Sequence, residues 1–398
     1  MAPVDEQLTV LMSGVDYGDA LLKRQMEREL RGLLEQDRPL RVYLGIDPTA
    51  TSLTLGHTVP LRKLRQFQEF GHHAIFLIGD CTALIGDPSD KNKLRPMLTQ
   101  EDIAANEATY FEQAARILDP RETELRHNSE WLLELDFKDI IALMSKFTAA
   151  EMLRRENFRN RWESGEAVYL HEFLYSLMQG YDAYALECDA QVGGTEQLFN
   201  LMAGRKIQED AGQKPHVPVT MPILVGLDGK ERMSKSTGNH IGVNDPPEEQ
   251  FGKAMSIPDE ALENFFTLAT NLHPDDVRGV MFALRNGERS PMDTKKLLAW
   301  TIVSEFWGEA AANAAQEHFE RTVQRKELPN DIPEYRIREG EPLLDVVVAA
   351  GAAPSKREAR RLFEQSAVTI DGLVMEPTTP ARRGSTVQVG KRRWIRLT

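Results

Sequence analysis

A turn between an apolar strand and a helix carries the first groups suited to chemistry. The strand 43–46 ends at Asp47-Pro48, and a run of small hydroxyl residues then leads to Leu55-Gly56-His57, where a helical pattern begins. A helix N-terminus after such a turn offers free backbone N–H groups and the positive end of the helix dipole. The turn therefore favours a phosphate site, although an ordinary strand-to-helix crossover would also explain it.

A second candidate is the polar loop 226–239, which contains Lys230, Arg232 and Lys235. A third is a helical face formed by Tyr175, Gln179 and Asp182, whose spacings of four and three place them together. Such a face could point to solvent. If it is buried, its polar groups need partners, and a polar ligand would supply them.

The elements around these residues predict how they meet. The strand 43–46, the following helix and the continuous apolar run 74–79 form a βαβ unit, which favours a doubly wound parallel sheet. Ligands of such sheets lie at the carboxyl ends of the strands. Asp80, Thr82 and Asp87 should therefore lie near His57.

The sequence predicts three folded parts. We expect a Rossmann-like α/β catalytic domain, then an all-α domain, and finally a small α+β domain. The stretch 326–342, with three prolines and mixed charge, indicates a linker before the last domain. Ser355 and Glu358 predict a capping box, and Asp371-Gly372 predicts a hairpin turn. The expected boundaries are 1–245 with a helical insertion at about 130–187, 246–326, the linker 327–341, and 342–398.

Composition limits the classes of function. The chain has a net charge of −13, but residues 351–398 hold ten Lys/Arg and four Asp/Glu, a balance of +6. A basic C-terminal segment in an otherwise acidic chain indicates that one module binds nucleic acid. No apolar run approaches the roughly 20 residues of a membrane span. Cys81 and Cys188 form no disulfide framework, so we expect a cytoplasmic protein without membrane contact.

Two signatures resemble class I aminoacyl-tRNA synthetases. Leu55-Gly56-His57 resembles the end of their His-x-Gly-His motif, and Met233-Ser234-Lys235-Ser236 resembles their Lys-Met-Ser-Lys-Ser loop. The stretches 45–49 and 84–89, the Tyr175 face and the Gly-Gly turn at 193–194 are similar to those of bacterial tyrosyl-tRNA synthetases. The basic tail resembles the S4 RNA-binding domain of that family. The resemblance runs from about residue 17 to the end.

The resemblance implies a tyrosine–tRNA ligase that uses ATP and needs no side-chain nucleophile. It implies that Tyr43 and Asp182 bind the phenol, a pair that phenylalanine would leave unpaired. The residues implied around the rest of the tyrosine are Asp87, Tyr175, Gln179, Gln197, Thr82 and Asn128. Those implied around the adenosine are Gly45, Asp47, Gly56, Gly193 and Glu196. Those implied around the phosphates are Thr49, Thr54, His57, Lys91, Arg95, Arg232 and Lys235.

The resemblance also implies partners. Mg²⁺ should accompany ATP on its phosphates rather than in a protein cage, and no protein-bound metal is expected. Arg357, Arg360 and Arg361 should contact tRNA(Tyr). The family is homodimeric, with the insertion near 130–170 at the interface.

The sequence departs from the family pattern at several positions. Thr54 replaces the first histidine of the first signature, Arg232 replaces the first lysine of the second, and Thr195-Glu196 replaces the usual Ser-Asp. Two alternatives therefore stay open. One is a ligase for a related aromatic amino acid, such as tryptophan, and the other is a non-catalytic relative that binds structured RNA.

Overall fold

The computed structural model describes residues 1–48, 52–89, 99–235, 237–324, 332–338, 340–390 and 393–398. The chain divides into two compact units, Met1–Glu309 and Ala310–Thr398. Among the described residues, no helix combines the length and apolar character that a membrane crossing requires.

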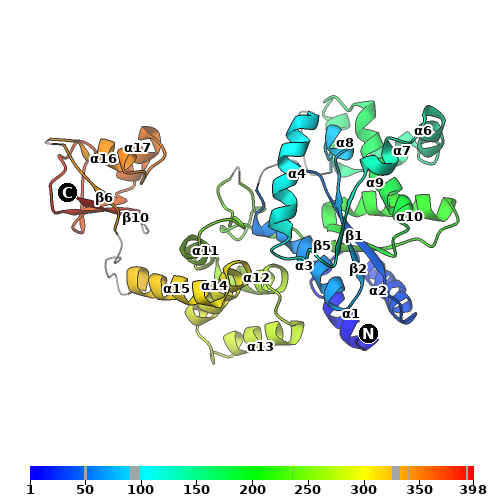
Figure 1. The fold of residues 1–398 in the computed structure, drawn as a ribbon, viewed down its shortest axis with the longest axis horizontal. Coiled ribbons are helices and arrows are strands. Elements are labelled where there is room, and N and C mark those ends of the chain that lie inside the picture. The colour runs from blue at the N-terminus through cyan, green and yellow to red at the C-terminus, as the bar shows by residue number, and fades with distance from the viewer. Residues whose placement is uncertain (49–51, 90–98, 236, 325–331, 339, 391–392) are drawn as a thin grey trace. The chain divides into compact units, whose positions relative to one another are not determined.

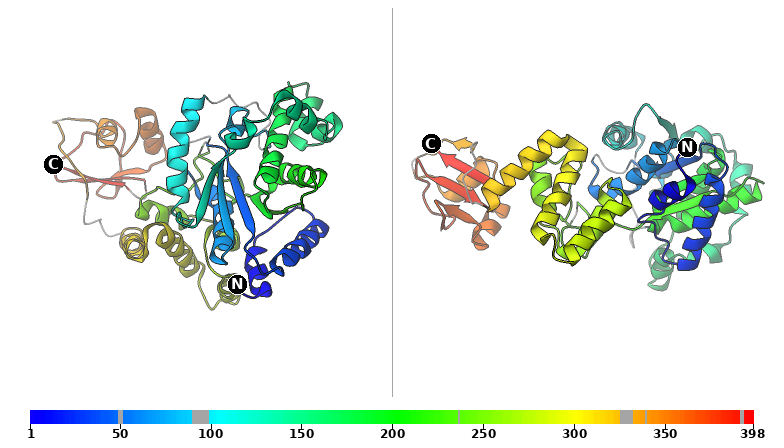
Figure 2. Two further views of the ribbon diagram at one scale, coloured as in Figure 1. Left: turned by 45° about the vertical axis from the view of Figure 1, so that its right-hand side comes forward. Right: turned by 90° about the horizontal axis from the view of Figure 1, so that it is seen from below.

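A five-stranded sheet lies at the centre of the first unit, with helices on both faces (Figures 1 and 2). Its strands are β1 (Arg41–Ile46), β2 (His73–Ile78), β3 (Thr123–His127), β4 (Ala190–Gly194) and β5 (Val217–Met221). They run parallel in the order β3-β2-β1-β4-β5. The doubly wound prediction is confirmed. The strand order reverses between β1 and β4, where such sheets bind ligands.

Some helices of the first unit cover the faces of the sheet, and others form a separate helical group (Figure 1). Those that precede β4 are α1 (Val4–Leu11), α2 (Ala20–Leu34), α3 (Leu55–Glu69), α4 (Gln100–Ala114), α5 (Ser129–Leu132), α6 (Phe137–Met144), α7 (Ala149–Leu153), α8 (Glu156–Glu163) and α9 (Leu170–Ala185), with a 3-10 turn at Thr82–Leu84. The later ones are α10 (Leu198–Asp210), α11 (Pro247–Ala254), α12 (Leu262–Ala269), α13 (Pro274–Arg285) and α14 (Pro291–Trp307), with 3-10 turns at Thr195–Gln197 and Asp259–Ala261.

Two glycines let α9 lie directly against α10. A Cβ on Gly180 would come within 2.8 Å of the Ile207 side chain and 3.0 Å of the Gly204 backbone nitrogen. A side chain there would push the helices apart. Because α9 carries the predicted tyrosine face, this close packing fixes that helix against α10, which follows β4 in the chain.

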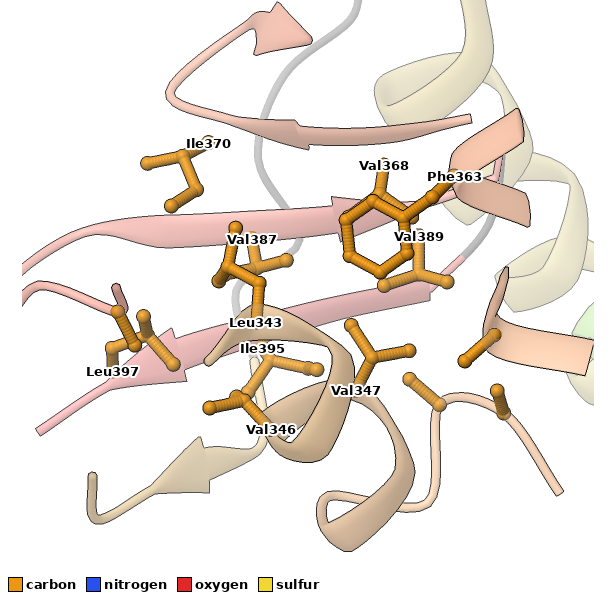
Figure 3. Packing of buried hydrophobic residues seen from close by; sticks show 14 of the residues in the cluster. Leu343, Val346, Val347, Phe363, Val368, Ile370, Val387, Val389, Ile395 and Leu397 are labelled. Carbon is orange, nitrogen blue, oxygen red and sulfur yellow. The ribbon is translucent and has the colours of Figure 1, made fainter. Parts of the chain in front are cut away.

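The second unit begins with the helix α15, and a small mixed sheet with two further helices follows it. Its elements are α15 (Glu309–Phe319, whose first residue closes the first unit), a π-helical turn (Glu320–Gln324), β6 (Glu334–Tyr335), α16 (Leu343–Ala349), α17 (Lys356–Glu364), β7 (Val368–Ile370), β8 (Leu373–Val374), β9 (Thr386–Val389) and β10 (Arg393–Leu397). The sheet order is β6-β10-β9-β7-β8. Figure 3 shows its core, where Leu343, Val346 and Val347 of α16 face valines of β7 and β9.

Two local predictions for this unit need correction. Residues 334–335, inside the expected linker, form β6 and pair with β10, so that part of the segment belongs to the sheet. Only half of the capping box forms. The Ser355 hydroxyl accepts from the Glu358 N–H, but the Glu358 carboxylate pairs with Arg361 at 2.6 Å. The predicted hairpin turn is confirmed, because Asp371 and Gly372 both have positive φ between β7 and β8.

Candidate active site

Two adjoining cavities open where β1 and β4 end. The first has a volume of about 200 Å³ and the second about 140 Å³. Their walls share His57, Pro60, Gly194, Glu196 and Arg232. The pair of cavities therefore forms one continuous site that can hold two joined chemical groups.

Most of the predicted site residues lie on these walls. Around the first cavity are Tyr43, Gly45, Asp47, His57, Thr82, Asp87, Asn128, Tyr175, Gln179, Asp182, Gly193, Glu196, Gln197 and Arg232. Thr54 and Gly56 line the second. Thr49, Lys91 and Arg95 lie outside the described residues. Arg357, Arg360 and Arg361 are exposed on α17 in the second unit.

One part of the first cavity is built around a buried carboxylate. Asp182 is 3% exposed and accepts hydrogen bonds from Trp131 Nε1 at 2.8 Å and Asn128 Nδ2 at 3.3 Å. Burial raises the pKa of Asp182, and these two donors oppose the shift. Burial also raises the pKa of Tyr43, to which the nearby Asp182 charge contributes. This region can hold a neutral group that donates and accepts hydrogen bonds.

Three buried polar atoms on the cavity wall have no hydrogen-bond partner among the described residues. They are the Tyr43 hydroxyl, Gln179 Oε1 and Glu196 Oε2. An unsatisfied buried polar atom costs about 1–3 kcal/mol. A polar ligand would satisfy all three, so the site fits a small molecule rich in hydroxyl, amine or phosphate groups.

Asp47, just after β1, connects the helix α9 to the turn that follows β2. Its carboxylate accepts hydrogen bonds from the Tyr175 hydroxyl at 3.0 Å and the Thr82 hydroxyl at 2.7 Å. Gly79, just after β2, leaves space for this pair, because a Cβ there would come within 2.2 Å of Asp47 and 2.4 Å of Thr82. Asp47 thus organises the tyrosine face of α9 as well as facing the cavity.

Asn128 stands at the N-cap position of α5, but its side chain makes no capping bond. Instead the amide oxygen accepts from the Cys81 N–H at 2.9 Å, and the amide nitrogen donates to Thr82 and Asp182. Asn128 therefore connects the carboxyl end of β3 to the walls of the cavity.

His57 is held in one tautomer by its neighbour. The Thr54 backbone N–H lies 3.2 Å from His57 Nδ1, and the Thr54 hydroxyl lies 2.8 Å from the same atom. A backbone N–H can only donate, so Nδ1 accepts and Nε2 carries the proton. Desolvation, together with the charges of Lys235 and Arg232, lowers the pKa of His57 to about 4. His57 is thus a neutral donor at the helix N-terminus.

The cationic loop is attached to the first signature. Lys235 Nζ donates to the carbonyl and the hydroxyl of Ser52, the latter at 2.6 Å. The backbone after the loop pairs with the same turn, with Leu55 N donating to Ile241 O and Val243 N to Leu53 O, both at 3.0 Å. The structure therefore brings the two separated signatures together, as their shared chemistry requires.

The comparisons with known proteins agree with this geometry. The family model described as "tRNA synthetases class I (W and Y)" matches residues 35–324. This chain belongs to that family of class I tRNA synthetases. A model for the "Tyrosine--tRNA ligase SYY-like C-terminal domain" matches residues 324–380.

Curated relatives of this class I synthetase match it over almost its whole length. The Thermotoga maritima "Tyrosine--tRNA ligase" is 46% identical, covering 95% of this chain and 96% of the relative. The Photobacterium profundum protein of the same name is 44% identical and covers 100% of both chains.

Solved structures share the fold of the synthetase. A truncated mitochondrial tyrosyl-tRNA synthetase of Aspergillus nidulans has a TM-score of 0.65 at 23% identity, covering 81% of this chain and 95% of the other. The Archaeoglobus fulgidus enzyme, solved with L-tyrosine, has a TM-score of 0.61 at 23% identity, covering 79% of this chain and 100% of the other. The Rossmann-like fold of the catalytic unit is therefore confirmed.

Two residues of the synthetase site were missed by sequence reasoning. Trp131, which lies behind the cavity wall, gives Asp182 its shorter hydrogen bond, and Pro60 lines both cavities. Trp131 comes three residues after Asn128 on the neighbouring turn, which is the one local signal that could have found it. Pro60 carries no polar side-chain group and is recognised only from the shape of the cavities.

Proposed function

We propose that this synthetase is a tyrosine–tRNA ligase, which activates L-tyrosine with ATP and transfers the tyrosyl group to the 3′ end of tRNA(Tyr). The observation that carries the proposal is that the Asp182 carboxylate and the Tyr43 hydroxyl, which has no hydrogen-bond partner among the described residues, both line the first cavity. A phenol hydroxyl can donate to the carboxylate and accept from Tyr43. A tryptophan side chain has no hydroxyl for this pair. The names of the full-length relatives support the same substrate.

The α-amino and carboxylate groups of tyrosine belong at the opposite part of the cavity. Asp87, Tyr175 and Gln179 hold the ammonium, and Gln197 orients the carboxylate. Thr82 and Asn128 support the wall through the Asp47 and Asp182 contacts. The hydrogen bond from Gln197 Nε2 to Asp87 Oδ2, at 2.6 Å, supports a joint role for these two residues.

The second cavity takes the adenosine. The nucleotide also reaches Gly45, Asp47 and Gly193 on the wall of the first cavity, while Gly56 lines the second. The unpartnered oxygen of Glu196, which lines both cavities, accepts a hydrogen bond from the ribose. The phosphates lie between the cavities. The residues that contact them are Thr49, His57, Lys91, Arg95, Arg232 and Lys235. Thr54 supports this set through its hydrogen bonds to His57 Nδ1.

The reaction needs no nucleophile from the protein. A tyrosine carboxylate oxygen bonds to the α-phosphorus of ATP as the bond to the bridging oxygen breaks, and pyrophosphate leaves with that oxygen. Charge grows on the phosphoryl oxygens, where His57 Nε2–H and the cations of the loop can stabilise it. Mg²⁺ bound to the phosphates of ATP would supply further neutralisation of that charge.

We further propose that the second unit binds tRNA. With residues 332–398 deleted, which removes β6 together with the rest of its sheet, aminoacylation of tRNA(Tyr) should fall by about 100-fold or more. Tyrosyl-adenylate formation should change less than about twofold, because the cavities lie in the first unit. Binding of tRNA by the intact chain should weaken as salt rises. Equal losses in aminoacylation and adenylate formation would contradict the proposal that the second unit serves tRNA binding alone.

We also propose a homodimer that works in the cytoplasm, where its tRNA is used. Large apolar side chains lie exposed on α6, α8 and α9 and on residues that flank α5 and α9. They are Leu133, Phe137, Ile141, Met144, Trp162, Tyr169 and Leu170. Other apolar residues of this segment, such as Met152 and Phe158, are buried within the subunit. An exposed apolar group of this size is typical of a subunit interface.

The dimer can be tested in solution. The double change Phe137→Asp and Leu170→Asp, at side chains 79% and 80% exposed, should convert a dimer to monomers in sedimentation velocity. Phe282→Asp on α13 is a matched control, since Phe282 is 61% exposed but lies outside this group. A wild-type chain that sediments as a monomer at micromolar concentration would refute the proposal.

A further inference from the structure

A buried arginine lies behind the amino-acid end of the first cavity. Arg155 is the N-cap residue immediately before α8 and is 7% exposed. Its guanidinium donates to the Ser176 hydroxyl at 2.7 Å and to the Ser89 hydroxyl at 2.6 Å. The rings of Phe158 and Phe199 pack against it, with centroids 5.2 and 4.8 Å from its central carbon. This cation is therefore rigidly held away from water.

The Ser89 hydroxyl that Arg155 contacts belongs to a closed ring of hydrogen bonds. Ser89 N–H donates to Asp87 Oδ1 at 2.8 Å, and Gln197 Nε2 donates to Asp87 Oδ2 at 2.6 Å. Asn200 Nδ2 completes the ring by donating to Gln197 Oε1 at 2.8 Å and to the Ser89 hydroxyl at 3.2 Å. Both carboxylate oxygens of Asp87 are thereby held in place.

A second side chain from the same segment supports the turn. Asn157 is 8% exposed, and its Nδ2 donates to the Pro88 carbonyl at 2.5 Å. Arg155 and Asn157 therefore hold the turn 87–89 from α8. In addition, the charge of Arg155 is partly balanced by Asp87, which counteracts the effect of burial on the pKa of Arg155.

We propose that Arg155 is a positioning residue that orients Asp87 and Gln197 toward the α-amino and carboxylate groups of the substrate. The proposal rests on the proposed tyrosine activation. Arg155 does not line either cavity, so it acts through Ser89 rather than by touching the ligand. Its effect should therefore depend on the ligand having an amine, and it should be absent for a ligand that offers only the phenol.

Tyramine and 4-ethylphenol differ by one amine and test this dependence. Each is measured as a competitive inhibitor of tyrosine-dependent ATP–pyrophosphate exchange by the full-length protein. In Arg155→Met, the KM for tyrosine and the inhibition constant of tyramine should rise about tenfold. The inhibition constant of 4-ethylphenol and the KM for ATP should stay within about twofold. Arg155→Lys should recover part of the loss, because lysine can reach one of the two hydroxyls.

Arg161→Met is the matched control. Arg161 lies on α8, is 3% exposed, and binds Glu172 instead of the turn 87–89. The Arg161→Met variant should have a lower melting temperature, but the inhibition constants of tyramine and 4-ethylphenol should not diverge from each other. Equal weakening of tyramine and 4-ethylphenol in Arg155→Met, or no weakening of either, would overturn the proposal. A wild-type chain without tyrosine-dependent exchange would instead refute the proposed function.

Discussion

Asp182→Asn should reduce kcat/KM for tyrosine in adenylate formation by about 10³-fold. The carboxylate is buried and accepts hydrogen bonds from Trp131 and Asn128, and the phenol is its remaining donor. An amide in its place points N–H groups at other donors and leaves buried polar groups unsatisfied, at a cost of about 2–5 kcal/mol. Steady-state exchange with varied tyrosine measures the loss, and the KM for ATP should change little.

Two controls separate this effect from general damage. Tyr43→Phe removes one hydroxyl from the same region and should cost about 1 kcal/mol, or roughly fivefold in kcat/KM. Asp189→Asn removes an ion pair with Arg38 at the other end of β4, outside both cavities, and should leave the KM for tyrosine unchanged. If Asp182→Asn activates tyrosine as well as wild type, the assignment of the phenol site is wrong.

His57→Ala should slow adenylate formation by about 10²- to 10³-fold in single-turnover experiments. The neutral imidazole, with its proton on Nε2, is a preorganised donor for charge that develops on the phosphates. Thr54→Ala should cost less, about three- to tenfold, because Thr54 acts through His57 Nδ1 and its backbone N–H remains in the variant.

The exposed His73 provides the control for the histidine change. It lies at the start of β2 and pairs with Glu124, away from both cavities, so His73→Ala should leave the single-turnover rate unchanged. A loss at Thr54 equal to or larger than the loss at His57 would show that the threonine itself faces the phosphates.

The sequence was most informative where local patterns determine geometry. Strand and helix periodicity predicted the βαβ core, and the spacing of Tyr175, Gln179 and Asp182 predicted that they share a wall of α9. Ligands of parallel sheets bind at the carboxyl ends of the strands, and this rule predicted that Thr82 and Asp87 lie at the same site. These inferences rest on contacts between residues that are close in sequence or on a general rule of topology.

The contacts that the sequence did not reveal join distant parts of the chain. Arg155 reaches Ser89 across 66 positions, and Lys235 reaches Ser52 across 183. No periodicity encodes such pairs, because they depend on how α8 and the loop pack in three dimensions. The short strand β6 was missed for the same reason, since its pairing with β10 is what makes residues 334–335 a strand.

The most direct test of tyrosine activation is ATP–pyrophosphate exchange by the purified chain with each of the standard amino acids in turn. The proposed function predicts rapid exchange with tyrosine and background rates with phenylalanine and tryptophan. Exchange with tryptophan in place of tyrosine would contradict the assigned substrate. Exchange with no amino acid would contradict the ligase itself and favour a relative that only binds RNA.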